Sequence, residues 1–169
     1  MKLILKQKLI SLHDKMTIRN EDGDVMYTVK SAAVSLSDKT YIQNANGDDV
    51  AYIHKKPISI HNKYYVELVN GDQFELSSEL FHVIKDIMEI PQLDWSLEGN
   101  LMEHDYKIID SHGNVVASTH KKWITLHHVY EIDINDEKNI DKIVAIYVCL
   151  EHILSTRAGV RSTTSQASQ

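Results

Sequence analysis

The sequence has very little of the residue types that cross-link a chain or bind phosphate in tight loops. Cys149 is the only cysteine, and only two of the 169 residues are proline. A single cysteine excludes an intrachain disulfide and any metal site built on a cysteine cluster. The six glycines are scattered, and they form no GxxxxGK, GxGxxG or GxSxG motif. The sequence therefore predicts no cofactor and no catalytic residues, and we expect a protein that is not an enzyme.

Positive charge is also scarce. Lys and Arg number 18 against 24 Asp and Glu, which gives a net charge of −6. This balance argues against nucleic acid as a partner. The first twelve residues have neither the sustained apolar stretch nor the small-residue cleavage site of a signal peptide. We expect a cytoplasmic, reduced protein, and peripheral association with a membrane stays open.

Long apolar runs are limited to one, Ile143–Leu150, within the segment IDKIVAIYVCLEHIL. A helix that is apolar on every side is enclosed by protein or lipid. The run is far shorter than the roughly 20 residues that span a bilayer. It therefore predicts a core helix over about residues 139–155, without stable membrane insertion. Residues 1–157 suit a single domain, and the Ser/Thr/Gln-rich segment 158–169 is expected to be disordered.

Turn signals recur between segments that are typical of strands. Asp22-Gly23, Asn46-Gly47, Asn70-Gly71 and His112-Gly113 supply the positive φ that hairpin turns need. A closed antiparallel sheet wrapped round the helix would bury it and leave no sheet edge. The pattern predicts a mainly β protein with strands at residues 2–12, 16–19, 25–30, 34–36, 40–43, 50–54, 58–60, 64–69 and 130–134.

Residues 78–90 fit two structures. Ser78 followed by spaced apolar residues is typical of a capped amphipathic helix. The same residues also fit two short strands, 80–84 and 87–90. The spacing of the other turns favours the strands.

An internal repeat relates Asn46–Leu68 to His112–Ile134 at a constant offset of 66 residues without a gap. Repetition of this length predicts two similar sheet halves. The identical pairs are Gly47/Gly113, Val50/Val116, Ala51/Ala117, His54/His120, Lys55/Lys121, Lys56/Lys122, Ile58/Ile124, His61/His127 and Tyr64/Tyr130.

Several segments resemble the LURP-one-related family. They are HDYKIID from His104, HGNVVASTHKKW, VYEIDI and the apolar helix. The opening LKQKLISLHDKMTIRNEDGDVMYTV and the central LDWSLEGNLMEHDY are similar to short bacterial members. The resemblance covers nearly all of residues 1–155. It implies a closed barrel of about twelve antiparallel strands with the helix through its centre, as in the tubby C-terminal domain and the phospholipid scramblases.

The family implies little about chemistry. Because the helix would fill the barrel interior, we expect a non-enzymatic binding or scaffold protein that acts through its outer surface on an unknown protein partner or an anionic lipid head group. The alternative is a membrane-associated, scramblase-like protein that binds phospholipid or phosphoinositide head groups. The candidate anion-binding residues are the twin sequences His54-Lys55-Lys56 and His120-Lys121-Lys122, which would form two symmetry-related basic corners. They are equally open to a plainer interpretation as solvated turn residues. The ten histidines include no HExxH motif, so no metal site is predicted.

Overall fold

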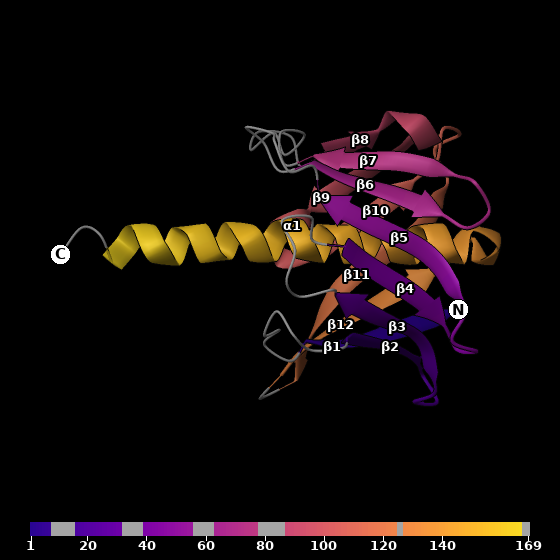
Figure 1. The fold of residues 1–169 in the computed structure, drawn as a ribbon, viewed down its shortest axis with the longest axis horizontal. Coiled ribbons are helices and arrows are strands. Elements are labelled where there is room, and N and C mark those ends of the chain that lie inside the picture. Colours follow the sequence, from indigo (N-terminus) through magenta and orange to yellow (C-terminus); the bar gives the residue numbers. More distant parts are fainter. Residues whose placement is uncertain (8–15, 32–38, 56–62, 78–86, 125–126, 167–169) are drawn as a thin grey trace.

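The computed structural model describes residues 1–7, 16–31, 39–55, 63–77, 87–124 and 127–166. These residues form twelve strands and a long C-terminal helix (Figure 1). The strands are β1 (Lys2–Gln7), β2 (Met16–Asn20), β3 (Val25–Ser31), β4 (Lys39–Asn44), β5 (Asp49–Lys55), β6 (Lys63–Leu68), β7 (Gln73–Ser77), β8 (Ile87–Ile90), β9 (Trp95–Asn100), β10 (Asp105–Ile109), β11 (Val115–Ile124) and β12 (His127–Ile134), and the helix is α1 (Ile140–Gln166).

All twelve strands belong to one antiparallel sheet, in the order β7-β6-β5-β4-β3-β2-β1-β12-β11-β10-β9-β8. Its two end strands, β7 and β8, lie beside each other, so the sheet curls into a nearly closed barrel. Figure 1 shows α1 running through the barrel and projecting beyond one end, which we call the mouth. The predicted fold class, a twelve-stranded antiparallel barrel around a hydrophobic helix, is confirmed.

Four of the hairpin turns opposite the mouth share one geometry, while β8 and β9 are joined by the 3₁₀ turn η2 (Pro91–Leu93). In the turn after β2, the Asn20 amide donates to Asp24 at 3.0 Å and the Gly23 amide donates back to Asn20 at 3.1 Å. Gly23 has φ +90°, a value that most side chains disfavour. The turns after β4, β6 and β10 repeat both hydrogen bonds. These are three-residue hairpin loops, and the glycine leads into a bulge that sharpens the sheet's curvature.

Alternation along the strands separates a dry inner face from a wetter outer face. In β6, for example, Tyr64, Val66 and Leu68 are buried while the residues between them are not. The inner faces of the strands pack against α1. From Ile143 to Leu150 no side chain is more than 1% exposed. The helix is therefore enclosed on every side, as its unbroken apolar run predicted.

The helix begins after a 3₁₀ turn, η4 (Glu137–Asn139), whose first amides are capped by the Asp136 carboxylate. It continues to Gln166, whereas the sequence placed its end near Ser155 and predicted disorder over residues 158–169. A helix that is already nucleated gains one backbone hydrogen bond for each residue added. No proline after Ser155 interrupts that process, which accounts for the greater length.

Several strand predictions can be compared with the structure directly. The segment 87–90 is strand β8, as the strand interpretation of residues 78–90 predicted. The expected strands 34–36, 58–60 and 80–84 lie outside the described residues, as do residues 8–12 of the first expected strand. The strands β7, β9, β10 and β11 were not predicted individually.

The barrel consists of two equivalent halves. The first half-barrel contains β2–β7, and the second contains β8–β12 followed by β1. Strands β4, β5 and β6 correspond to β10, β11 and β12 with residue numbers that differ by 66, and their pairing registers are the same. Even the bulge after Ile42 recurs after Ile108. The repeated sequence thus corresponds to a repeated hairpin, and the structural repeat extends one strand further than the sequence repeat.

Candidate functional site

The twin His-Lys-Lys sequences occupy equivalent places at the mouth ends of β5 and β11. His54 lies opposite Tyr65, and Lys55 lies opposite the buried Tyr64. The second half-barrel repeats this arrangement, with Lys121 opposite the buried Tyr130. Successive residues of a strand point to opposite faces. Each histidine therefore lies on the outer face, while the first lysine lies on the inner side of the mouth.

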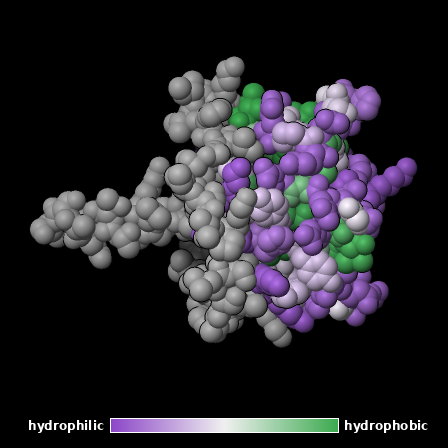
Figure 2. All heavy atoms as spheres, turned by 45° about the horizontal axis from the view of Figure 1, so that its top comes forward, coloured by the Kyte–Doolittle hydropathy of each residue, from purple (hydrophilic) through white to green (hydrophobic). Residues whose placement is uncertain are grey.

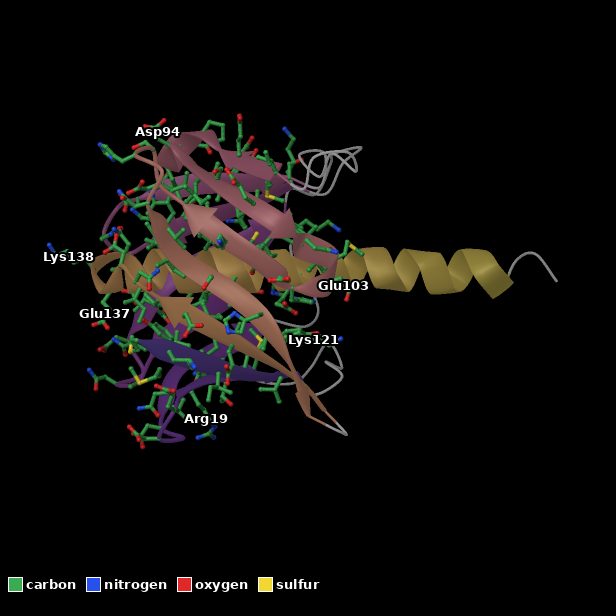
Figure 3. All side chains as sticks on the ribbon, turned by 180° about the vertical axis from the view of Figure 1, so that it is seen from behind. Arg19, Asp94, Glu103, Lys121, Glu137 and Lys138 are labelled. Carbon is green, nitrogen blue, oxygen red and sulfur yellow. The ribbon has the colours of Figure 1, made fainter. Side chains whose placement is uncertain are left out.

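This arrangement changes the predicted basic corner. The histidine and the first lysine of each motif lie on opposite faces of the strand. Figure 3 shows Lys121 at the mouth, near the point where α1 leaves the barrel. Lys56 lies outside the described residues, and so does the side chain of Lys122.

The two outer histidines have different surroundings. The ring of His54 stacks on Tyr65, with 5.3 Å between ring centroids. The Nε2 atom of His120 instead lies 3.2 Å from a carboxylate oxygen of Asp133. Lys2 adds a positive charge beside Asp133, and the nearby Glu131 raises the pKa of Lys2. An anion approaching His120 would therefore meet two carboxylates, which makes this corner the poorer phosphate site.

A buried polar cluster that sequence reasoning missed lies inside the barrel towards the mouth. The Glu151 carboxylate of α1 is 2.9 Å from Nδ1 of His104, and both side chains are almost fully buried. The ring of His104 lies 4.1 Å from that of Tyr130. Tyr147 lies one turn earlier on the helix, and burial, together with the nearby Glu151, raises the pKa of its phenol well above the ordinary value. Its hydroxyl therefore stays protonated.

The residues of this cluster suit a structural role rather than a reactive one. Burial also raises the pKa of Tyr130, to about 12, so that this phenol stays protonated.

The lone thiol, Cys149, is fully buried, and burial raises its pKa as well. A thiol that stays protonated is a poor nucleophile and a poor metal ligand. Within the described residues, no three His, Cys, Asp or Glu side chains come close enough to hold a metal ion.

Polar contacts also hold the other end of the helix. Tyr27 donates to the Asp141 carboxylate at 2.6 Å. The next residue, Lys142, lies 2.9 Å from Asp72 and 5.3 Å from the ring centre of Trp95. The ammonium group of Lys142 lowers the pKa of Asp72. A segment that is apolar on every side has no hydrophobic preference for one rotation about its own axis. The polar contacts at the two ends of α1 therefore fix its rotation within the barrel.

Comparison with known proteins agrees with the fold. The family model described as LURP-one-related matches residues 1–151. An X-ray structure of a protein from Arabidopsis thaliana superimposes with a TM-score of 0.52 at 15% identity, covering 90% of this chain and 91% of the other. Among curated proteins, no sequence matches. No helix of the described chain combines the length and hydropathy needed to cross a bilayer.

Proposed function

We propose that this chain, which belongs to the LURP-one-related family, is a non-enzymatic binding protein that contacts its partner through its outer surface. The observation that carries the proposal is the filled interior. The side chains from Ile143 to Leu150, at most 1% exposed, occupy the axis where a barrel of this size would otherwise hold a ligand. We place this binding protein in the cytoplasm, where its single thiol stays reduced.

The outer surface has the character of a soluble binding protein. Figure 2 shows one face on which most described residues are hydrophilic and the hydrophobic areas are small and separate. A surface of this kind suits contact with a polar partner more than insertion into a membrane. It supports binding in which α1 stays inside the barrel.

The sole cysteine provides a direct test. Cys149 lies on the enclosed part of α1. We expect a small maleimide to label it only as fast as the protein unfolds globally, with or without phosphatidylserine vesicles. A Ser118→Cys variant carries a second thiol on the outer face and should take up one equivalent promptly. Rapid labelling of Cys149, or faster labelling with vesicles, would mean that the helix leaves the barrel, and the proposal would fail.

A second candidate function is binding of an anionic lipid head group at the mouth. Lys55 and Lys121 occupy equivalent positions on the inner side of the mouth, on opposite walls around α1. Since α1 passes between them, each ammonium group would bind a separate phosphate on its own side of the mouth.

Vesicle co-sedimentation tests this candidate. The wild-type chain should sediment with phosphatidylinositol phosphate vesicles at low salt and less at physiological salt, because ions screen the attraction. A Lys55→Glu, Lys121→Glu variant should lose binding. The matched control is Arg19→Glu with Lys138→Glu, which removes the same charge away from the mouth (Figure 3). Equal loss in both variants would indicate a net-charge effect, and no sedimentation at any salt would exclude this candidate.

A further inference from the structure

The outer faces of the two half-barrels differ although their strands superimpose in register. In the first half-barrel, the outer positions of β3–β6 form a surface that we call the tyrosine wall. Its members are Lys30, Lys39, Tyr41, Tyr52, His54 and Tyr65. Figure 1 shows β4, β5 and β6 on the near side of the barrel, with no other strand or helix in front of them.

The aromatic rings of the tyrosine wall lie in two adjacent cross-strand rows. Tyr41 and Tyr52 face each other edge-on across β4 and β5, with ring centroids 5.5 Å apart. His54 and Tyr65 form the stacked pair across β5 and β6. All four rings are only partly buried, because their neighbours along each strand fill the inner face instead. Together they offer a rigid, partly wet aromatic surface of the kind found at the centre of protein interfaces.

Positive charge borders the rings on one side. Lys30 lies opposite Tyr41, and Lys39 lies opposite His54. Both lysines are exposed, and within the described residues neither forms an ion pair. On the other side, Glu67 lies opposite Tyr52, and the Tyr52 hydroxyl donates to Asp49 at 3.3 Å. The surface therefore has one positive edge, formed by the two lysines. It would attract an acidic partner by steering.

The second half-barrel shows that the fold does not require these residues. Its outer positions form what we call the acidic wall. In register, Lys30 corresponds to Glu98, Lys39 to Asp105, Tyr41 to Lys107, Tyr52 to Ser118 and Tyr65 to Glu131. All three tyrosines are replaced by polar residues, and both lysines by acids. The same backbone thus accepts Lys, Ser and Glu where the tyrosine wall has aromatic residues, so packing alone does not explain them.

We propose that the tyrosine wall is the docking surface for an acidic segment of a partner protein. The aliphatic or aromatic side chains of that segment would pack on Tyr41, Tyr52 and Tyr65, while its carboxylates pair with Lys30 and Lys39. On the acidic wall, Glu98 and Asp105 stand at the positions of the two lysines and would repel the same segment, which directs it to one half-barrel. This inference rests on the proposed outer-surface binding and names the surface and the chemistry of the partner.

The test is an NMR titration of the full-length ¹⁵N-labelled chain. The probe is a capped 12-residue peptide in which Asp or Glu alternates with Leu or Phe, and its control has Lys in place of every acid. We expect amide shifts confined to β3–β6 with the acidic peptide, reduced at high salt, and no saturable shifts with the Lys peptide.

Each variant is taken from the equivalent position of the other half-barrel. Tyr52→Ser and the pair Lys30→Glu, Lys39→Asp should each weaken binding about tenfold. The matched control, Lys107→Ala with Ser118→Ala on the acidic wall, should leave the affinity unchanged. Thermal unfolding confirms that every variant is folded, which the equivalent residues of the second half-barrel lead us to expect.

The location of the shifts separates failure of this inference from failure of the proposed function. Saturable shifts elsewhere on the outer surface, or none at all, would overturn the tyrosine wall as a docking site and leave outer-surface binding standing. Shifts in Ile143–Leu150 would instead indicate a ligand inside the barrel and contradict both. Concentration-dependent shifts of the free chain on both walls would assign the tyrosine wall to self-association and overturn the partner. Equal binding to phosphatidylserine vesicles, abolished by the same variants, would assign it to a membrane.

Discussion

The two half-barrels are nearly the same inside and different outside. On the inner face, Ile42 matches Ile108, Ala51 matches Ala117 and Tyr64 matches Tyr130, and all six are buried. On the outer face, the tyrosine wall stands where the other half has the acidic wall. The inner positions are alike because both halves must enclose the same helix. The outer positions are under no such constraint, so their residues are free to differ, as the proposed binding surface requires.

The helix itself distinguishes the halves, because one helix cannot present the same side chain to both. Near the mouth, His152 contacts Thr40 of the first half-barrel at 3.2 Å, a hydrogen bond at the barrel's rim. Glu151 contacts His104 of the second half-barrel, and that pair is deeply buried. Near the mouth, the second half-barrel therefore contacts α1 through a deeply buried pair and the first through a polar contact at the rim. At the other end of α1, the polar contacts come from Tyr27 and Asp72 of the first half-barrel.

Removing His104, the partner of the buried Glu151 carboxylate, should cause the largest loss of stability among these predictions. His104→Ala leaves the Glu151 carboxylate without its histidine in the interior, which we expect to lower the free energy of unfolding by about 3–5 kcal/mol. His152→Ala removes the corresponding contact to the first half-barrel and should cost about 1 kcal/mol. Urea unfolding measures both. Equal losses would show that the two halves hold the helix alike.

Truncations on the inner face should have large effects of equal size. Ile42 and Ile108 are equivalent, and at most 1% of either is exposed. Each change to Ala should lower the free energy of unfolding by about 2–5 kcal/mol through lost burial and a new cavity. The urea midpoints of the two variants should agree closely, with unchanged slopes. A difference above about 2 kcal/mol would break the claim that the inner faces are equivalent.

The smallest expected effect on stability comes from a substitution in a hairpin turn. Asp110 of the second half-barrel corresponds to Asn44 of the first, and hydrogen bonds from Asn114 lower the pKa of Asp110. A lowered folded-state pKa gives stability that is present above the unfolded value, about 3.9, and is lost as pH falls through the folded value. Asp110→Asn should therefore flatten the dependence of melting temperature on pH below about pH 5.

The control for this prediction is the turn of the other half-barrel. Asn44→Asp should not introduce the same acid sensitivity, because Asp48 stands where the second half-barrel has Asn114. The Asp48 carboxylate, 3.4 Å from the Asn44 amide nitrogen, would repel the new acid. An unchanged slope of melting temperature against pH in Asp110→Asn would mean that this turn does not contribute to acid stability.

The sequence predicted what local pattern controls. The apolar run fixed the enclosed helix, the Asp-Gly and Asn-Gly pairs marked three of the hairpin turns, and the repeat showed that the sheet has two similar halves. The pair of Glu151 and His104 could not be predicted, because 47 residues separate them in the sequence and only the closed barrel brings them together. The signal available was a single acid at the end of an otherwise apolar segment.

The candidate site was predicted in part. Identical residues drew attention to the His-Lys-Lys motifs, yet strand alternation divides each motif between two faces. The tyrosine wall was not predicted, because its residues differ between the two repeats and the comparison of the repeats was based on identical residues. Tyr41 and Tyr65 are also 24 residues apart, and become neighbours of Tyr52 and His54 only through the register of β4, β5 and β6.

Hydrogen exchange of the helix amides tests most directly whether α1 stays inside the barrel and leaves only the outer surface for binding. We predict that the amides from Ile143 to Leu150 exchange only through global unfolding, with the same free energy as the most protected amides of β11 and β12, and that phosphatidylserine vesicles do not change this. Exchange of these helix amides at a clearly lower free energy, while the strands stay protected, would show that the helix leaves an intact barrel and would contradict the account.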